Sequence, residues 1–154
     1  MAGSAQLTVN GAISQSGTRG LTKTGAGVLV LGAENAFTGT TDIAAGKIVV
    51  NHAYALDRST VWINVDNGLD VTTHSVNATL GSLAGSGALN LGSAHIYTGL
   101  NGDTATYSGA ISGSGGVHVG GSGTQTLSAD STYSGGTSVA EGATLAISAD
   151  NNIG

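Results

Sequence analysis

The fold of this chain is decided by residues 21–50, which read LTKTGAGVLVLGAENAFTGTTDIAAGKIVV. Two four-residue runs in it, 28–31 and 47–50, are rich in Val, Leu and Ile, and each follows a Gly-containing corner. Such short runs bounded by Gly are typical of β-strands. We therefore predict an all-β chain in which no helix is longer than one turn. The best candidate for such a one-turn helix is 52–57, at a corner. Further strands are expected at 7–9, 61–65, 88–91, 117–119, 124–127 and 144–147.

The chain also contains an internal repeat, which is stronger evidence than any single strand. Residues 21–46 align without a gap to residues 117–142, a shift of 96, with eight identities in 26 positions. Because Phe37 and Tyr133 are equivalent, we expect both to pack inward or against a corner. The repeat positions are Leu21, Gly25, Gly27, Leu31, Phe37, Gly39, Thr41 and Gly46 in one copy, and Gly121, Gly123, Leu127, Tyr133, Gly135, Thr137 and Gly142 in the other.

The composition excludes several classes of protein. The chain of 154 residues has 27 Gly, no Pro and no Cys, and only 8% of its residues are charged. Helical bundles and coiled coils need far more Glu, Lys and Arg, and collagen needs Pro with Gly at every third position. Four Lys and Arg residues in a chain of net charge −5 cannot form a phosphate-binding stripe, so we expect no nucleic-acid partner.

A repeat of short strands and Gly-rich corners indicates a solenoid, in which each coil stacks its strands on those of the coil before it. Asn, Ser and Thr can form hydrogen-bonded ladders in such a stack, whereas ladders of like charge would repel. At roughly 20 to 25 residues per coil, the chain would form about six or seven coils, spaced by roughly 4.8 Å.

Residues 21–31 and 35–51 resemble the autotransporter-associated β-strand repeat, also called the passenger-associated transport repeat. The first copy has the usual Leu-Thr-Lys-x-Gly-x-Gly-x-Leu-x-Leu pattern, followed by an aromatic-x-Gly-x-Thr step at 37–41. The second copy keeps that step at 133–137 but has Val-His-Val at 117–119 in place of Leu-Thr-Lys. The resemblance implies a right-handed parallel β-helix in the extracellular passenger of a type V autotransporter, with a C-terminal outer-membrane barrel in the parent protein.

The expected layout is one β-helix segment over 1–154, an internal fragment of a longer passenger. The first repeat copy covers about 11–51, an intervening segment about 52–108, and a truncated second copy about 109–154. Unpaired strands at the two ends of such a segment would favour end-to-end self-association.

Candidate chemistry is sparse, and we expect no cofactor and no metal site. The four His residues are far apart in the sequence and lack metal-ligand spacing. Gly120–Thr124 resembles the start of the calcium-binding nonapeptide but departs from it, because Gln125 stands where the nonapeptide has Asp. The densest acidic patch is Asp66 and Asp70, with Asp57 and His74 nearby in sequence, and it could serve a β-helical enzyme acting on polysaccharides.

Three functions remain open. The leading hypothesis is a non-catalytic structural segment of an extracellular stalk at the bacterial cell surface, which supports secretion and folding. The alternative is an adhesin surface that binds a host or sister-cell receptor, with Tyr54, Arg58 and Trp62 as contact residues because exposed aromatics and Arg favour binding. A polysaccharide-active β-helix enzyme is third.

Overall fold

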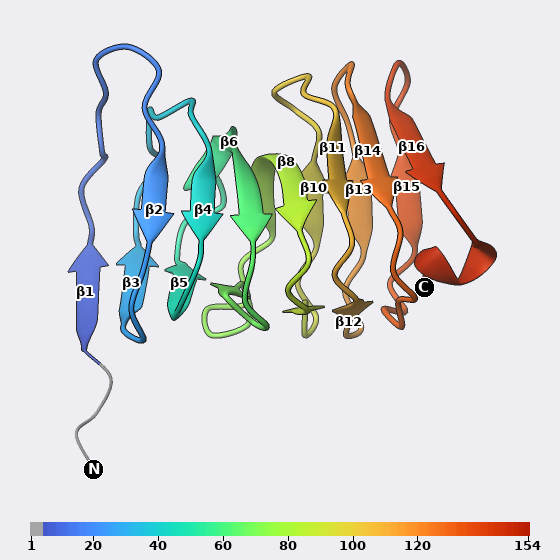
Figure 1. The fold of residues 1–154 in the computed structure, drawn as a ribbon, viewed down its shortest axis with the longest axis horizontal. Coiled ribbons are helices and arrows are strands. Elements are labelled where there is room, and N and C mark those ends of the chain that lie inside the picture. Colours follow the sequence, from blue (N-terminus) through green and yellow to red (C-terminus); the bar gives the residue numbers. More distant parts are fainter. Residues whose placement is uncertain (1–4) are drawn as a thin grey trace.

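The chain forms a parallel β-solenoid of about seven turns in the computed structural model, which describes residues 5–154 (Figure 1). Strands of the face nearest the viewer run downward while the chain advances from left to right, so the solenoid is right-handed. The elements are β1 Gln6–Val9, β2 Leu21–Lys23, β3 Val28–Leu31, β4 Thr41–Ile43, β5 Lys47–Val50, β6 Leu56–Ile63, β7 Leu69–Asp70, β8 Ala78–Gly85, β9 Leu89–Asn90, β10 Ile96–Thr98, β11 Ala105–Tyr107, β12 Ile111–Ser112, β13 Val117–Val119, β14 Thr124–Leu127, β15 Thr137–Val139, β16 Thr144–Ile147 and the 3-10 turn η1 Asp150–Asn152.

The solenoid has three faces. The front sheet, toward the viewer in Figure 1, runs β2-β4-β6-β8-β11-β14-β16, and the back sheet runs β8-β10-β13-β15. The third face is formed by β1-β3-β5-β7 and then by the pair β9-β12. All strand pairs are parallel. One coil leads from Leu21 to Thr41 and a slightly longer one from Val61 to Leu83, which matches the coil length expected from the sequence.

The core is a column of small and branched side chains. In β4, Thr41 and Ile43 point inward and are fully buried, while Asp42 between them faces outward. Phe37 and Tyr133 are both buried at corners, which confirms the expectation from the repeat. None of the described residues forms a helix with the length and apolar character to cross a membrane.

Most strands lie where the sequence predicts them, and a few of their boundaries differ. The strand expected at 61–65 is β6, which begins at Leu56 and ends at Ile63, because its first half bends around the corner from the back sheet with an irregular register. The one-turn helix expected at 52–57 is wrong: residues 52–55 form a non-helical turn, and the helical turn among the described residues is η1 at Asp150–Asn152. The strand expected at 88–91 is the shorter β9.

The two repeat copies lie on different faces of the solenoid. In the first copy, β2 and β4 belong to the front sheet and β3 and β5 to the third face. In the second copy, β13 and β15 belong to the back sheet and β14 and β16 to the front sheet. Along the front sheet, the register of successive coils relates Leu21 to Ala105. From Ala105 the chain crosses the third face and reaches Val117, the start of the second copy, in the back sheet. The repeat is thus a strand-corner-strand unit that fits more than one corner.

Close stacking explains one pair of repeat glycines. A Cβ added to Gly39 would lie 2.5 Å from the backbone carbonyl carbon of Arg19, and one added to Gly135 would lie 2.5 Å from that of Gly115. In both copies the backbone of the preceding coil occupies the space that a side chain would need. Gly at this repeat position therefore lets successive coils approach each other.

Candidate functional site

The loop between β10 and β11, residues 99–104, interrupts the regular stacking of the front sheet. It rises above the coils in yellow in Figure 1. Between β6 and β8 four consecutive residues pair, Thr60–Ile63 with Ser82–Gly85, but between β8 and β11 the pairing falls to one, Gly85 with Tyr107. The front sheet therefore opens beside this loop.

Gln125 fills the opening from the inside. Its side chain is 1% exposed, accepts a hydrogen bond from the backbone N–H of Leu83 and donates one to the carbonyl of the same residue, at 3.1 and 2.8 Å. It also accepts a hydrogen bond from the hydroxyl of Thr98 and donates to the carbonyl of Ala105. The side-chain amide thus replaces the missing strand pairing. Gln125, where a calcium-binding nonapeptide would have Asp, is a buried structural residue.

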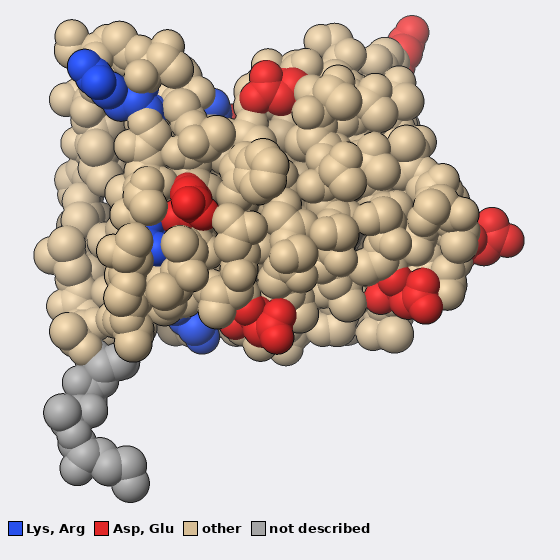
Figure 2. Space-filling view, viewed as in Figure 1, with Lys and Arg blue, Asp and Glu red and all other residues tan. Residues whose placement is uncertain are grey.

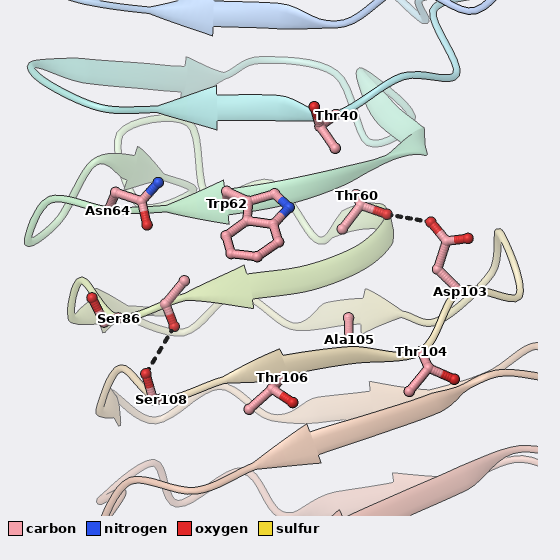
Figure 3. Close-up of a pocket in the computed structure, with 11 residues that line it drawn as sticks. Thr40, Thr60, Trp62, Asn64, Ser86, Asp103, Thr104, Ala105, Thr106 and Ser108 are labelled. Carbon is pink, nitrogen blue, oxygen red and sulfur yellow. Dashed lines mark hydrogen bonds between the residues drawn. The ribbon is translucent and has the colours of Figure 1, made fainter.

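Outside the opening lies a groove of about 660 Å³ beside Trp62 (Figure 3). The indole projects from β6 and lies over β8, where its register partner is the small residue Ala84. Because Ala84 and Thr106 are the next residues along this row, no large side chain covers the ring, and Trp62 remains 44% exposed. The groove is lined by Thr40, Thr60, Trp62, Asn64, Gly85, Ser86, Asp103, Thr104, Ala105, Thr106 and Ser108.

Asp103 fixes the loop to the wall of this groove. One oxygen of its carboxylate accepts hydrogen bonds from the Thr60 hydroxyl at 2.6 Å and from the Asn101 amide at 2.8 Å. Asn101 in turn donates to Thr60 and accepts from the hydroxyl of Ser82. The Asp103 carboxylate is consequently held in one orientation at the end of the groove (Figure 3).

Arg58 lines a second recess, of about 460 Å³, on the other side of the loop. Its guanidinium is half exposed and is paired with Glu34 of the preceding coil at 3.3 Å and with Asp57 at 3.9 Å. Burial raises the pKa of Asp57, an effect that Arg58 offsets only in part, and one buried oxygen of Asp57 has no hydrogen-bond partner among the described residues. Asp103 lines this recess as well as the groove.

Tyr54 lines a third recess, of about 410 Å³, together with Tyr97 of β10 and with Leu100 of the loop. Tyr54 is 50% exposed, and Leu100 also lines the recess of Arg58. The three predicted contact residues thus lie in three separate recesses that share one loop. The sequence predicts no role for this loop, because its position beside Trp62 depends on coil stacking.

A stack of rings on the back sheet was also missed. Tyr97 and His118 are register partners, with ring centroids 4.6 Å apart, and His95 stacks against His118 as well, with ring centroids 5.1 Å apart. Burial and the neighbouring His95 lower the pKa of His118. These His residues are distant in the sequence, and only the coil period brings them together.

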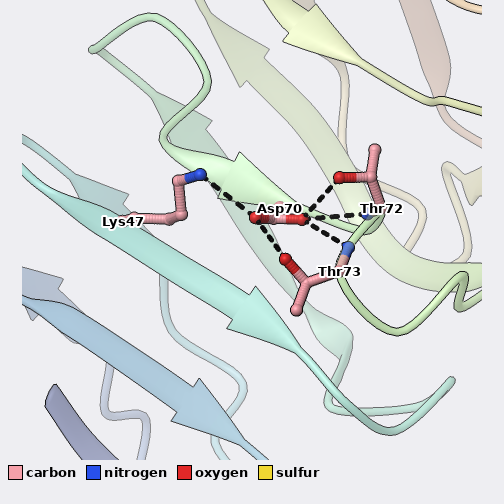
Figure 4. Close-up of polar contacts among 4 residues, drawn as sticks. All are labelled: Lys47, Asp70, Thr72 and Thr73. Carbon is pink, nitrogen blue, oxygen red and sulfur yellow. Dashed lines mark hydrogen bonds and ion pairs between the residues drawn. The ribbon is translucent and has the colours of Figure 1, made fainter.

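Asp70, from the acidic patch singled out in the sequence, is held by its neighbours (Figure 4). Asp70 is buried in β7 and accepts hydrogen bonds from the backbone and hydroxyl groups of Thr72 and Thr73, and Lys47 pairs with it at 3.1 Å. Burial alone would raise the pKa of Asp70, but these donors outweigh it and hold that pKa well below its usual range. Asp57 lies instead in the recess of Arg58. Over residues 5–154, no cluster of three or more His, Asp or Glu could hold a metal ion.

Comparison with known proteins identifies the repeat. The family model described as Passenger-associated-transport-repeat matches residues 21–50 and 120–147. The chain is 34% identical over 123 residues to a protein named Adhesin BmaC autotransporter, from Brucella suis biovar 1 (strain 1330). This match covers 76% of the chain but only 4% of that relative. No solved structure matches the chain.

Proposed function

Since the chain is an autotransporter passenger segment that carries passenger-associated transport repeats, we propose that it acts as a non-catalytic structural segment of an extracellular β-helical stalk. The observation that carries this proposal is the continuous front sheet from β2 to β16, which joins both repeat copies in one stack. In a stack of this kind each coil contacts mainly its neighbours, so the segment is a stiff spacer.

The same architecture favours folding at the cell surface. Each coil adds a similar increment of packing and hydrogen bonding onto the coil before it, so folding can propagate along the chain. In the parent protein the segment would be anchored through a C-terminal outer-membrane barrel and would lie outside the cell. The repeats would then support secretion through the stepwise folding of their coils.

Two neighbouring residues of β6 test this role. Ile63 is fully buried, whereas Trp62 beside it faces outward. In the parent passenger, Ile63→Asp places a charge in the core and should reduce surface display, measured by antibody labelling of intact cells. Trp62→Ala should leave display unchanged. Circular dichroism of the isolated Ile63→Asp segment shows whether it is unfolded. If it is unfolded and the Ile63→Asp passenger is still displayed normally, the proposal is contradicted.

Adhesion is the second candidate function, and the exposure of Tyr54, Arg58 and Trp62 around one loop favours it. The named relative is an adhesin. Arrays of extracellular matrix proteins and of glycans, probed with the intact chain, test this role. Binding that is lost on substitution around the loop supports it, and blank arrays of both kinds would argue against it.

A further inference from the structure

We propose that the groove beside Trp62 binds a neutral oligosaccharide, with one sugar ring stacked on the indole. This inference names a ligand class for the adhesive role described above and rests on that role only for the location of the site outside the cell. The binding itself is a property of the groove and can be measured on the isolated chain.

The indole of Trp62 forms an aromatic platform at the surface. Trp62 is 44% exposed, and its neighbours along the row, Ala84 and Thr106, are too small to cover the ring. A sugar ring presents an apolar face of C–H groups and a polar rim of hydroxyls. An indole with an uncovered face satisfies the apolar side of such a ligand, and large aromatic anchors supply much of the energy at binding sites.

Groups that suit the hydroxyl rim surround the platform. The groove presents the hydroxyls of Ser86 and Thr106, which can each donate or accept a hydrogen bond, and that of Ser108, which donates to the carbonyl of Gly85 and can still accept. The Asn64 amide donates to Asp42 at 2.8 Å and keeps its carbonyl oxygen as an acceptor. One oxygen of Asp103 is engaged with Thr60 and Asn101, while the carboxylate as a whole is held at the groove wall (Figure 3).

The charge of the groove selects a neutral ligand. No Lys or Arg is among its lining residues, and its one charged group is the Asp103 carboxylate. Figure 2 shows the same face with few charged side chains on a surface that is otherwise uncharged. Among the described residues of the groove, an anionic glycan would meet the Asp103 carboxylate, which forms no ion pair there, and no cation, so repulsion disfavours it.

The length of the groove suits several sugar rings in a row. Its lining residues extend from Thr40, just before β4, past β6 and β8 to Thr104, just before β11. Three strand spacings of about 4.8 Å give a length of about 14 Å along the solenoid axis. The opened pairing between β8 and β11 lies at one end of the groove.

The chain carries its own reporter for this test, because Trp62 is its single Trp. The intact chain is titrated with cellohexaose, xylohexaose, mannohexaose and maltohexaose, with oligogalacturonate as the anionic comparison, and indole fluorescence is followed. We expect a saturable change with at least one neutral hexaose and none with oligogalacturonate. Calorimetry on Trp62→Ala should show a loss of affinity of about tenfold or more.

Val139→Ala is the control, because Val139 is 47% exposed on β15 of the back sheet and lines none of the three recesses that share the loop. It should bind the same hexaose as the unmodified chain does. Equal binding by Trp62→Ala, no binding of any neutral hexaose, or preferred binding of oligogalacturonate would each overturn the inference. If the hexaoses fail while a matrix protein binds around the loop, the adhesive role stands without a glycan ligand; if both fail, both are wrong.

Discussion

Gly46 and Gly142 are equivalent in the two repeats but have different surroundings. Both have positive φ, +72° and +81°. A Cβ on Gly46 would lie 2.3 Å from the carbonyl oxygen of Gly25, whereas a Cβ on Gly142 meets nothing within 4 Å. We predict that Gly142→Ala costs about 1–2 kcal/mol of unfolding free energy, the usual strain of this backbone region. Gly46→Ala should cost at least twice as much in urea denaturation, and equal costs would show that coil stacking does not crowd Gly46.

Asp70 should make the stability of the chain sensitive to acid. Its pKa is lowered in the folded chain, so its stabilising effect is fully present above the unfolded pKa of about 3.9 and is lost as the pH falls through the folded pKa. At neutral pH, Asp70→Asn should cost about 2 kcal/mol, because it weakens hydrogen bonds to a charged acceptor. Denaturant unfolding at pH values from 7 to 3 should show a shallower decline for Asp70→Asn than for the unmodified chain. Parallel declines would contradict this assignment.

At the scale of the strands, Gln125 determines whether the front sheet tolerates its opening. Gln125→Leu leaves the backbone N–H and carbonyl of Leu83 and the hydroxyl of Thr98 without this partner. We expect a loss of about 2–4 kcal/mol, since an unsatisfied buried polar group costs about 1–3 kcal/mol. Thr126→Val, on the outward side of the same strand, should change stability by less than about 0.5 kcal/mol. Similar small effects in both variants would show that Gln125 is dispensable.

Local patterns in the sequence predicted the strands and the corners. The runs at 28–31, 47–50, 117–119, 124–127 and 144–147 are strands with the expected bounds, because branched residues between glycines leave few alternatives. The repeat also predicted the burial of Phe37 and Tyr133. These features depend on residues that are close together in the chain or equivalent between the copies.

Features that depend on the coil period could not be predicted in this way. Gln125 contacts Leu83 and Asp103 contacts Thr60, and each of these pairs is separated by two coils of the chain. The shift between the copies indicates their equivalence but not the face on which each lies, because coil length varies along the front sheet. The loop at 99–104 and the groove beside Trp62 follow from that stacking and not from any local pattern.

The whole molecule is a three-faced solenoid in which the second repeat copy is displaced by one face relative to the first. Thr106 and Thr126 are register partners in the front sheet, and Tyr97 and His118 are register partners in the back sheet. Adjacent strands place such partners about 4.8 Å apart, within the range that a disulfide spans. The chain has no Cys, so paired substitutions report on these contacts alone.

The most direct test is oxidation of three double-Cys variants, with disulfides identified by mass spectrometry. Thr106→Cys/Thr126→Cys and Tyr97→Cys/His118→Cys should both form an intramolecular disulfide under mild oxidation. His118→Cys/Thr126→Cys should not, because its residues lie on the back and front faces of one coil. Cross-linking of the last pair, or failure of either register pair in a folded chain, would contradict the arrangement of the two repeats described above.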